Sequence, residues 1–326
     1  KSDDFTPYIY KTEDYGKRWK LITNGIDKMN FKRCLRADRK RRGLLYAGTE
    51  YGMYISFDDG AHWKPFQLNL PSTQIADMTI KDNDLVVATH GRAFWVLDDL
   101  SVLQQMNSNV LNQNLHVFDV NPAYRMAGGR FRGKGGGTQA NIGTKPPSGV
   151  VFNYWVKDLK DSAKAFVKIF DASHKEVKTY STKSKEDKLD IDKGMNQFVW
   201  NFQYPQAEKA EGMVLWNGAP GSLLAPPGNY FARFIVEKDS VEVPFEIKAD
   251  PNYKISQQDY EAQFNFLMDV RNKFNEVQNA IKDIRSLRTQ INSFVALQGK
   301  NIPKDVKEMA DSINKRLTAI ETELVQ

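Results

Sequence analysis

A repeated eight-residue motif near the N-terminus constrains the fold of this chain more than any other feature. The segments 12–19 (TEDYGKRW) and 56–63 (SFDDGAHW) share the pattern [Ser/Thr]-x-Asp-x-Gly-x-x-Trp. In such a segment the Asp and Ser/Thr side chains can hydrogen-bond to the turn backbone, Gly can adopt a positive φ, and Trp can pack back over the turn. The motif therefore predicts two hairpin turns of the same construction, each belonging to one structural repeat.

A third, weaker copy follows at an offset of 40 residues. Residues 46–59 (YAGTEYGMYISFDD) align without gaps to residues 86–99 (VVATHGRAFWVLDD), so that Tyr54 matches Phe94, although the motif's Gly and Trp are lost. Short apolar strands that repeat every 40 to 45 residues are typical of the four-stranded blades of a β-propeller. The repeat thus predicts blades of this kind.

The motif resembles the Asp box, or BNR (bacterial neuraminidase) repeat, of sialidases, xyloglucanases and sortilin-like receptors. Residues 88–99 further resemble the last blade of the bacterial sortilin-like proteins known as BNR-repeat glycosyl hydrolases. The resemblance implies that residues 1–110 are the C-terminal blades of a propeller. Because a propeller needs about four to eight blades to close, we expect this chain to be the C-terminal portion of a larger protein. The remaining blades would come from a missing N-terminal part or another chain.

The rest of the chain is predicted to form three regions. Residues 111–148, rich in Gly and without periodicity, are expected to be a linker or long loop. Residues 149–250 contain alternating apolar segments at the spacing of an antiparallel β-sandwich, resembling a fibronectin- or immunoglobulin-like module. Residues 251–326 have apolar residues at steps of three and four, interrupted near Gly299, which predicts an antiparallel α-helical hairpin. The expected fold class is mainly β with a helical C-terminus.

The helical hairpin is a candidate protein-binding arm. Phe264, Phe266 and Phe274 lie near the start of its first helix, and we expect them to dock that end against the other domains. The tip, residues 294–303, is expected to be free to contact a protein partner.

The Asp-box carboxylates are predicted to be structural, because neighbouring strand residues point to opposite faces and cannot act on one substrate. The structural positions of the two boxes are Thr12, Asp14, Gly16, Trp19, Ser56, Asp58, Gly60 and Trp63. The hairpin turns at the opposite ends of the strands are the candidate ligand-binding rim. They carry Glu50, Tyr51, His90 and Arg92, an acid, a phenol, a base and an anion partner.

Two functions from different classes follow from the resemblance. The first is a non-catalytic binding or scaffolding part of a secreted, periplasmic or cell-surface sortilin-like protein, with a peptide, protein or glycan ligand. The alternative is the C-terminal part of a glycoside hydrolase of the sialidase or xyloglucanase kind. That chemistry needs two facing carboxylates, and Glu50 is the one weak catalytic candidate in this chain. The second carboxylate would then lie in other blades.

Composition and motifs argue against other classes. The single cysteine, Cys34, excludes a disulfide framework, and the four histidines lack metal-ligand spacing, so neither metal nor cofactor is expected. The glycines of 128–137 lack the Ser or Thr that a phosphate-binding loop needs. The basic run 32–42 has no interleaved aromatics, so we interpret it as a solvated loop between strands and expect no nucleic-acid partner. The sequence contains no apolar run long enough for a transmembrane segment.

Overall fold

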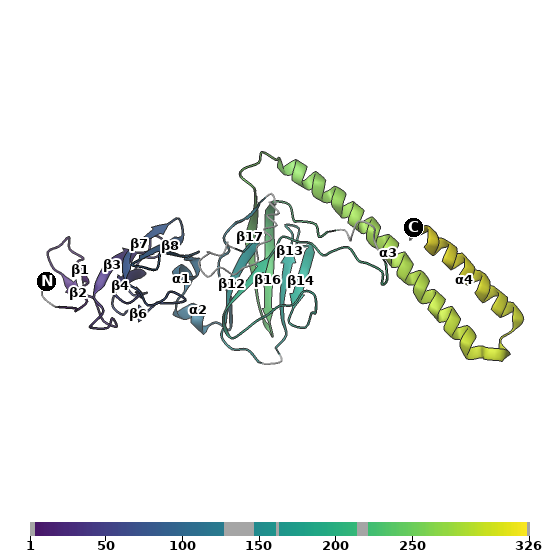
Figure 1. Ribbon diagram of the computed structural model, residues 1–326, viewed down its shortest axis with the longest axis horizontal. Helices are drawn as coiled ribbons and strands as arrows, with labels where there is room; N and C mark the ends of the chain where they lie inside the picture. Colours follow the sequence, from purple (N-terminus) through teal and green to yellow (C-terminus); the bar gives the residue numbers. More distant parts are fainter. Residues whose placement is uncertain (1–3, 127–146, 161–162, 214–220, 325–326) are drawn as a thin grey trace. The chain divides into compact units, whose positions relative to one another are not determined.

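The structure is a computed structural model of the 326-residue chain. It describes residues 4–126, 147–160, 163–213 and 221–324. The chain divides into two compact units, Lys1–Asp119 and Val120–Gln326 (Figure 1). Both contain β-sheets and the second ends in two helices, so a mainly β chain with a helical C-terminus is confirmed. The glycine-rich stretch 128–137 lies outside the described residues.

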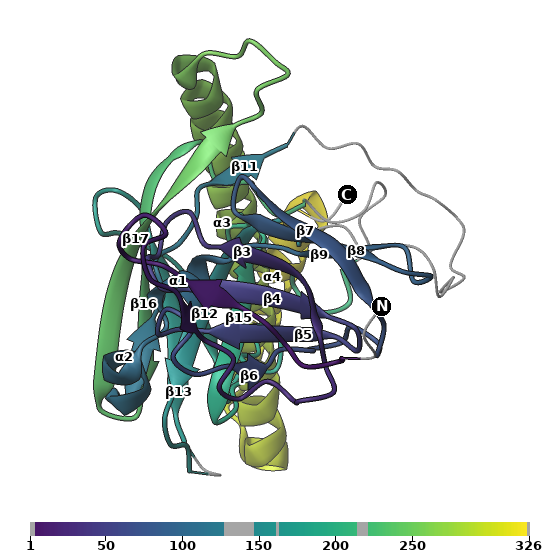
Figure 2. The same ribbon diagram turned by 90° about the vertical axis from the view of Figure 1, so that its left-hand side faces the viewer.

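The first unit contains three antiparallel sheets that follow one another along the chain. The first sheet pairs β1 (Tyr10–Lys11) with β2 (Lys20–Leu21). The second has the order β3 (Lys32–Ala37), β4 (Leu45–Thr49), β5 (Met53–Ser56), β6 (Lys64–Pro65), and Figure 2 shows these strands in front. The third has the order β7 (Ile75–Lys81), β8 (Asp84–Thr89), β9 (Phe94–Leu97). The unit also contains α1 (Ser101–Gln105), α2 (Ser108–Asn112) and β10 (Leu115–Val117).

The two central strands of the second sheet are buried on both faces, and this explains their sequence. All residues of β4 and β5 are buried. Leu45 and Ala47 belong to an apolar cluster that includes residues of the first sheet's hairpin, whereas Tyr46 belongs to a cluster with Ile75 and other residues of the third sheet. Because successive strand residues point to opposite faces, a strand covered on both sides needs a mainly apolar sequence, and β4 and β5 are apolar except at their terminal residues Thr49 and Ser56. The described residues of the unit thus form stacked sheets and do not form a closed propeller.

The described residues of the second unit contain two sheets, whose strands are those expected from the alternating segments together with two that were not predicted, 123–125 and 176–181. One pairs β12 (Val150–Val156) with β15 (Gly194–Trp200), antiparallel over its whole length. The other has the order β11 (Ala123–Arg125), β17 (Asp239–Ala249), β16 (Gly228–Val236), β13 (Ala165–Phe170), β14 (Glu176–Ser181). One pair departs from the antiparallel expectation, because β11 runs parallel to β17. Both β10 and β11 fall within the range predicted to be linker.

An aromatic core joins these two sheets. Phe152 of β12 lies 5.6 Å from Phe234 of β16 and 5.1 Å from Phe245 of β17, measured between ring centroids. Trp200 of β15 is fully buried and contacts Tyr230 at 5.7 Å. Burial of such large rings is the main apolar contribution to the core. The two sheets therefore pack face to face through these aromatic side chains.

The C-terminal segment forms the predicted helical hairpin. The helix α3 (Gln257–Gln298) begins at a capping box in which Ser256 accepts from the backbone of Asp259, and it ends at Gly299. A short turn, η1 (Gly299–Asn301), leads to α4 (Lys304–Leu324). Two hydrogen bonds show that the helices are antiparallel. Arg285 of α3 donates to Glu321 of α4 at 2.7 Å. Farther along α3, Asn292 accepts from Asn314, which comes before Glu321 in α4, at 2.9 Å.

The first helix is held against an irregular segment, 204–211, that follows β15. Phe264 lies 4.8 Å from Tyr204 between ring centroids. Gln278 is fully buried and its side-chain oxygen accepts from the backbone N–H of Ala210 at 2.9 Å. Docking through Phe264 therefore occurs within the second unit. The same prediction was wrong for Phe266, which is 67% exposed because it points away from the helix face that carries Phe264.

The interpretation of the basic run 32–42 as a loop is wrong for its first half. That half is the strand β3, in which Cys34 is buried. The arginines of this strand make ion pairs, Arg33 with Glu50 at 2.7 Å and Arg36 with Asp77 at 2.6 Å. Long basic side chains can cover a sheet surface while their charged ends remain in water, so a high charge density did not prevent strand formation.

Candidate functional site

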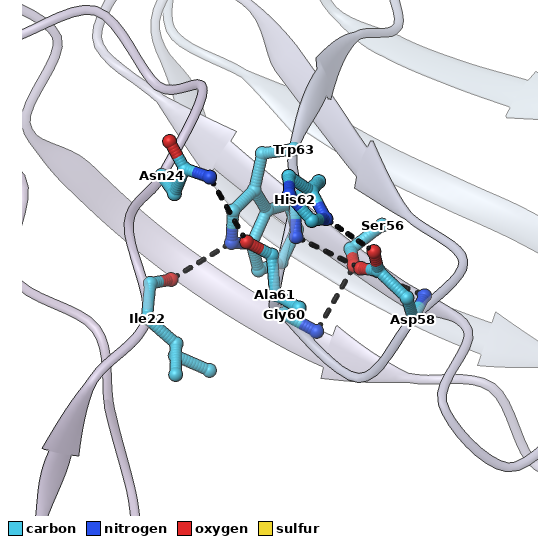
Figure 3. Close-up of polar contacts among 8 residues, drawn as sticks. All are labelled: Ile22, Asn24, Ser56, Asp58, Gly60, Ala61, His62 and Trp63. Carbon is cyan, nitrogen blue, oxygen red and sulfur yellow. Dashed lines mark hydrogen bonds and ion pairs between the residues drawn. The ribbon is translucent and has the colours of Figure 1, made fainter.

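The second copy of the repeated motif, 56–63, which is named the second Asp box only for its resemblance to that motif, is a turn closed by its own side chains (Figure 3). The hydroxyl of Ser56 accepts from the N–H of Gly60 at 2.9 Å and donates to Asp58 at 2.9 Å. The same Asp58 oxygen accepts from the N–H of His62 at 2.8 Å, and its second oxygen lies 2.7 Å from His62 Nδ1. The backbone has positive φ values at Asp59 (60°) and Gly60 (86°), as residues in tight turns often do. All of these bonds stabilise the turn itself.

The first Asp box, 12–19, repeats this geometry with different residues. Thr12 accepts from the N–H of Gly16 at 2.8 Å, and Asp14 accepts from the N–H of Arg18 at 2.8 Å. The Arg18 guanidinium replaces the His62 ring as the partner of the second carboxylate oxygen, at 2.9 Å. The side chains at the Ser/Thr and Asp positions thus accept hydrogen bonds from equivalent backbone N–H groups in both turns.

The two Asp-box carboxylates are held in their charged form. The hydrogen bond from the Arg18 side chain, together with that from its backbone, lowers the pKa of Asp14 below its ordinary value. Partial burial raises the pKa of Asp58, but the hydrogen bonds from His62 and Ser56 together outweigh burial, so the net pKa is lowered. A general acid needs a raised pKa, so neither carboxylate has the property of a catalytic acid.

The two motif tryptophans differ sharply in their surroundings. Trp63 is 3% exposed, and its indole N–H donates to the carbonyl of Ile22 at 2.8 Å, in the preceding repeat (Figure 3). Its own backbone N–H donates to Asn24 at 2.8 Å. Trp19 is 61% exposed and its indole N–H donates only within its own turn, to Gly16 at 3.1 Å. Trp63 therefore fastens one repeat to the one before it, whereas Trp19 contacts no preceding repeat in the described part of the chain.

A lysine that the sequence analysis missed links the two Asp boxes. Lys11, in β1, makes ion pairs with both Glu13 and Asp59. These bonds, that to Asp59 first, raise the pKa of Lys11. The three side chains line a polar groove of about 770 Å³ between the boxes. Lys11 thus connects the acids of the two boxes by ion pairs, which contribute modestly at an exposed surface.

The predicted rim residues lie at the other end of the strands from the second Asp box. In the β4–β5 hairpin, Leu45 pairs with Ser56 at the Asp-box end and Gly48 pairs with Met53 at the end where the turn carries Glu50 and Tyr51. The Asp box and the turn are thus separated by the length of β5.

The segment 71–74 connects the two rim turns. The hydroxyl of Ser72 donates to the carbonyl of Tyr51 at 3.3 Å, and that of Thr73 donates to the carbonyl of His90 at 3.2 Å. The backbone of His90 also donates to Gln74 at 2.9 Å. Hairpin turns about 40 residues apart in sequence therefore lie on one side of the unit.

The exposed groups of this rim are aromatic and basic. Tyr51 is 61% exposed, and His90 and Arg92 are also exposed. Glu50 is engaged by Arg33, whose guanidinium also lies 4.6 Å above the ring of Phe31. The rim thus presents hydrogen-bonding and aromatic groups, while its carboxylate is already neutralised by a neighbouring arginine.

The third repeat differs from the gap-free alignment by one residue. Gly48 pairs with Met53 in the second sheet, but the equivalent Ala88 pairs with Phe94 in the third. The turn of the third repeat is therefore one residue longer, so Phe94 corresponds to Met53 rather than to Tyr54. Beyond this turn, the position of Asp58 is taken by Asp99.

The described residues contain no group of three or more His, Cys, Asp or Glu side chains that could hold a metal ion. None of the described helices is both long and apolar enough to cross a lipid bilayer.

Comparison with known proteins gives distant matches only. No family model matches the chain, and no curated protein is significantly similar to it. Among solved structures, the extracellular domain of a proposed one-component system from B. thetaiotaomicron aligns at 9% identity with a TM-score of 0.24, over 76% of this chain and 29% of that chain. The extracellular domain of a proposed hybrid two-component system from B. thetaiotaomicron aligns at 9% identity and a TM-score of 0.24, over 74% and 28% respectively. The chain thus spans less than a third of either structure, and at this TM-score the matches support no inference about its fold or its function.

Proposed function

We propose that the first unit contributes Asp-box repeats to a β-propeller of the sortilin-like kind, and that this propeller binds a peptide or glycan without catalysis. The second unit would be a fibronectin- or immunoglobulin-like module followed by a helical arm. The main support for a binding role is the rim itself. Two turns distant in sequence, held together by Ser72 and Thr73, present the exposed side chains Tyr51, His90 and Arg92 on one side.

The geometry of Glu50 favours binding over hydrolysis. Glycoside hydrolysis in most families uses two carboxylates that flank the scissile bond. Glu50 accepts from Arg33 at 2.8 Å. The carboxylates of Asp14 and Asp58 accept hydrogen bonds from backbone N–H groups of their own turns. A protein of this construction is better suited to hold a ligand than to cleave it.

The remaining blades of the proposed propeller would be further Asp-box repeats. Trp63 shows how consecutive repeats fit, because it is buried against Ile9, Ile22 and other residues of the preceding repeat. Trp19 occupies the same motif position and is 61% exposed. A preceding repeat, from the same polypeptide or another, would cover it in the same way.

The rim proposal can be tested with matched variants. The purified protein would be applied to a glycan array and to a displayed random-peptide library, and the best ligand would be titrated by calorimetry. Tyr51→Ala and Arg92→Ala should each weaken binding about tenfold or more, which is the loss expected when a central contact is removed. Tyr15→Ala, which alters a fully exposed tyrosine in the first Asp-box turn, should change nothing. Equal effects of Tyr15→Ala and Tyr51→Ala would contradict a rim site.

The hydrolase alternative is tested on the same protein. Release of reducing ends from xyloglucan, or of a fluorophore from a sialic acid glycoside, should remain at the level of buffer alone. Turnover that is lost in Glu50→Gln would overturn the non-catalytic proposal.

The helical hairpin is proposed to be a partner-binding arm, and the whole protein to act outside the cytoplasm. Exposed apolar residues on the hairpin support the first point, among them Leu297 (85%) and Met309 (65%). A partner identified by cross-linking should bind less tightly to Leu297→Ser and Met309→Ser variants than to the parent protein. Unchanged affinity would contradict this role for the arm, and recovery of the native protein in the cytoplasmic fraction would contradict the location.

A further inference from the structure

A second, unrelated site is formed within the second unit. A cavity of about 470 Å³ lies between the first half of α3 and the segment 221–224, which precedes β16. Its volume falls within the roughly 300–1,000 Å³ typical of small-molecule sites. Most of its lining is apolar. The apolar side chains are those of Leu223, Leu224, Phe264, Leu267, Val270 and Phe274.

The cavity also contains two arginines and no acidic residue. Arg125, from β11, donates to the carbonyl of Ala225 at 3.1 Å and lies 5.2 Å from the ring of Tyr260. Arg271, from α3, donates to the carbonyl of Pro205 at 3.2 Å. Neither guanidinium forms an ion pair with a carboxylate in the described parts of the chain. Arginines beside apolar surface are normally paired with an anion.

One donor in this cluster lacks an acceptor altogether. The Nε of Arg271 is buried and has no hydrogen-bond partner among the described residues. Buried donors are almost always satisfied in folded proteins. Because protein atoms cover this Nε, a ligand in the cavity would reach Arg271 through its Nη atoms, and the Nε shows that the described residues leave the hydrogen-bonding capacity of the guanidinium incomplete. A carboxylate is the acceptor that matches the planar guanidinium group best, because its two oxygens can accept two parallel N–H bonds.

We propose that this cavity binds a small amphiphilic monocarboxylate, a fatty-acid-like molecule. Its carboxylate accepts from Arg271, with Arg125 supplying the second positive charge, and its aliphatic chain lies against Leu224, Leu267 and Val270. These three side chains are between 38% and 48% exposed, so an aliphatic chain would remove apolar surface from water. The proposal concerns residues of the second unit and does not depend on the rim function.

The test uses dodecanoate, with dodecanol and dodecyltrimethylammonium as head-group controls, each kept below its micelle concentration. Calorimetry on the full chain should show saturable binding of one dodecanoate per protein. Dodecanol should bind at least tenfold more weakly and the cation not at all. Equal binding of dodecanoate and dodecanol, or no saturable binding of dodecanoate, would overturn the proposal.

Variants separate the head-group site from the tail site. Arg271→Gln and Arg125→Gln should each weaken dodecanoate binding about tenfold or more and leave dodecanol unaffected. Val270→Trp places a large side chain on a half-exposed helix position, so it should fill the cavity and abolish binding while the protein stays folded. Arg316→Gln, which changes an exposed arginine of α4, should bind as the parent does. Thermal melts of each variant identify loss of fold, and undiminished binding by folded Arg271→Gln and Val270→Trp proteins would refute the site.

Discussion

Replacing Trp63 by alanine tests whether the Asp-box tryptophan fastens one repeat to the next. The side chain is 3% exposed and packs in a cluster with Ile9, Ile22 and Tyr54. Truncation of a buried Trp to Ala costs about 3–5 kcal/mol. Loss of the indole N–H also leaves the Ile22 carbonyl without its donor, which adds about 1 kcal/mol. We expect the first unit to lose about 4–6 kcal/mol, a large part of the roughly 5–15 kcal/mol that stabilises a typical domain.

The matched control is Trp19→Ala, because Trp19 occupies the same position of the motif in the first repeat. Its 61% exposure and its local hydrogen bond to Gly16 predict a loss of no more than about 1 kcal/mol. A third variant, Trp63→Phe, keeps most of the apolar contact and removes the indole donor, so its loss should fall between those of the two alanine variants.

The assay must report on the first unit alone, since a chain with two compact units need not unfold in one step. Hydrogen exchange followed by mass spectrometry gives the opening free energy of individual peptides. Peptides covering 20–30 and 44–63 should lose protection in Trp63→Ala, and those of the second unit should not. Equal losses in Trp19→Ala and Trp63→Ala, or a loss below about 1 kcal/mol in both, would show that exposure and packing were misjudged.

Four further outcomes are expected. In a urea titration, Gly25→Ala should destabilise the first unit by about 3 kcal/mol or more, because Gly25 has φ of 98° and an added Cβ would lie 2.2 Å from the carbonyl oxygen of Trp63. Gly91→Ala, at φ of 85° with open space around it, should cost only about 1 kcal/mol in the same urea titration. The folded-state pKa of Asp58 is lowered, so its contribution is complete above the unfolded pKa of about 3.9 and disappears as the pH falls through the folded value; melting temperatures between pH 6 and pH 2.5 should therefore fall less steeply for Asp58→Asn, and parallel curves would contradict this. Glu321→Gln removes the negative charge and one of the two acceptor oxygens that bind two arginines of α3, each at 2.7 Å, and should lower the stability of the hairpin by about 1 kcal/mol in a thermal melt.

The elements that were predicted correctly have signals within one continuous segment. The helices α3 and α4 follow from apolar steps of three and four maintained over many turns, and the strand β12 follows from the run of β-branched and aromatic residues between Val150 and Val156. Such patterns are repeated many times in one element, so a single unusual residue does not hide them.

The elements that were missed depend on pairing or on small insertions. The strand β3 is half-buried and rich in arginine, so its charge concealed the single buried position at Cys34. The extra residue in the turn before Phe94 cannot appear in an alignment that allows no gaps. The first error came from treating charge as evidence of a loop, although Arg33 is neutralised by Glu50 of the β4–β5 turn and Arg36 by Asp77 of β7.

The candidate sites were predictable to different degrees. The rim turns could be placed from the repeat alone, because a hairpin puts its turn and the following Asp box at opposite ends of a strand. The ion-pair partner of Glu50 could not be predicted, because Arg33 lies in β3 and its distance from Glu50 depends on the register between β3 and β4. The amphiphile cavity had no local signal, because Arg125 and Arg271 are far apart in sequence and only the tertiary fold brings them to one wall.

Stability within the first unit should decrease from its middle sheet to its first. The strands β4 and β5 are buried on both faces, whereas Tyr10 of β1 and Leu21 of β2 are 53% and 47% exposed. In stacked repeats each member is stabilised mainly by its neighbours, so a member covered on one face opens more readily than one covered on both. Native-state hydrogen exchange should therefore rank the amides of β4 and β5 as slowest and those of β1 and β2 as fastest. Adding a preceding Asp-box repeat by fusion should slow exchange in β1 and β2 selectively, and uniform protection across the three sheets of the unfused protein would show that burial by neighbouring sheets does not control its stability.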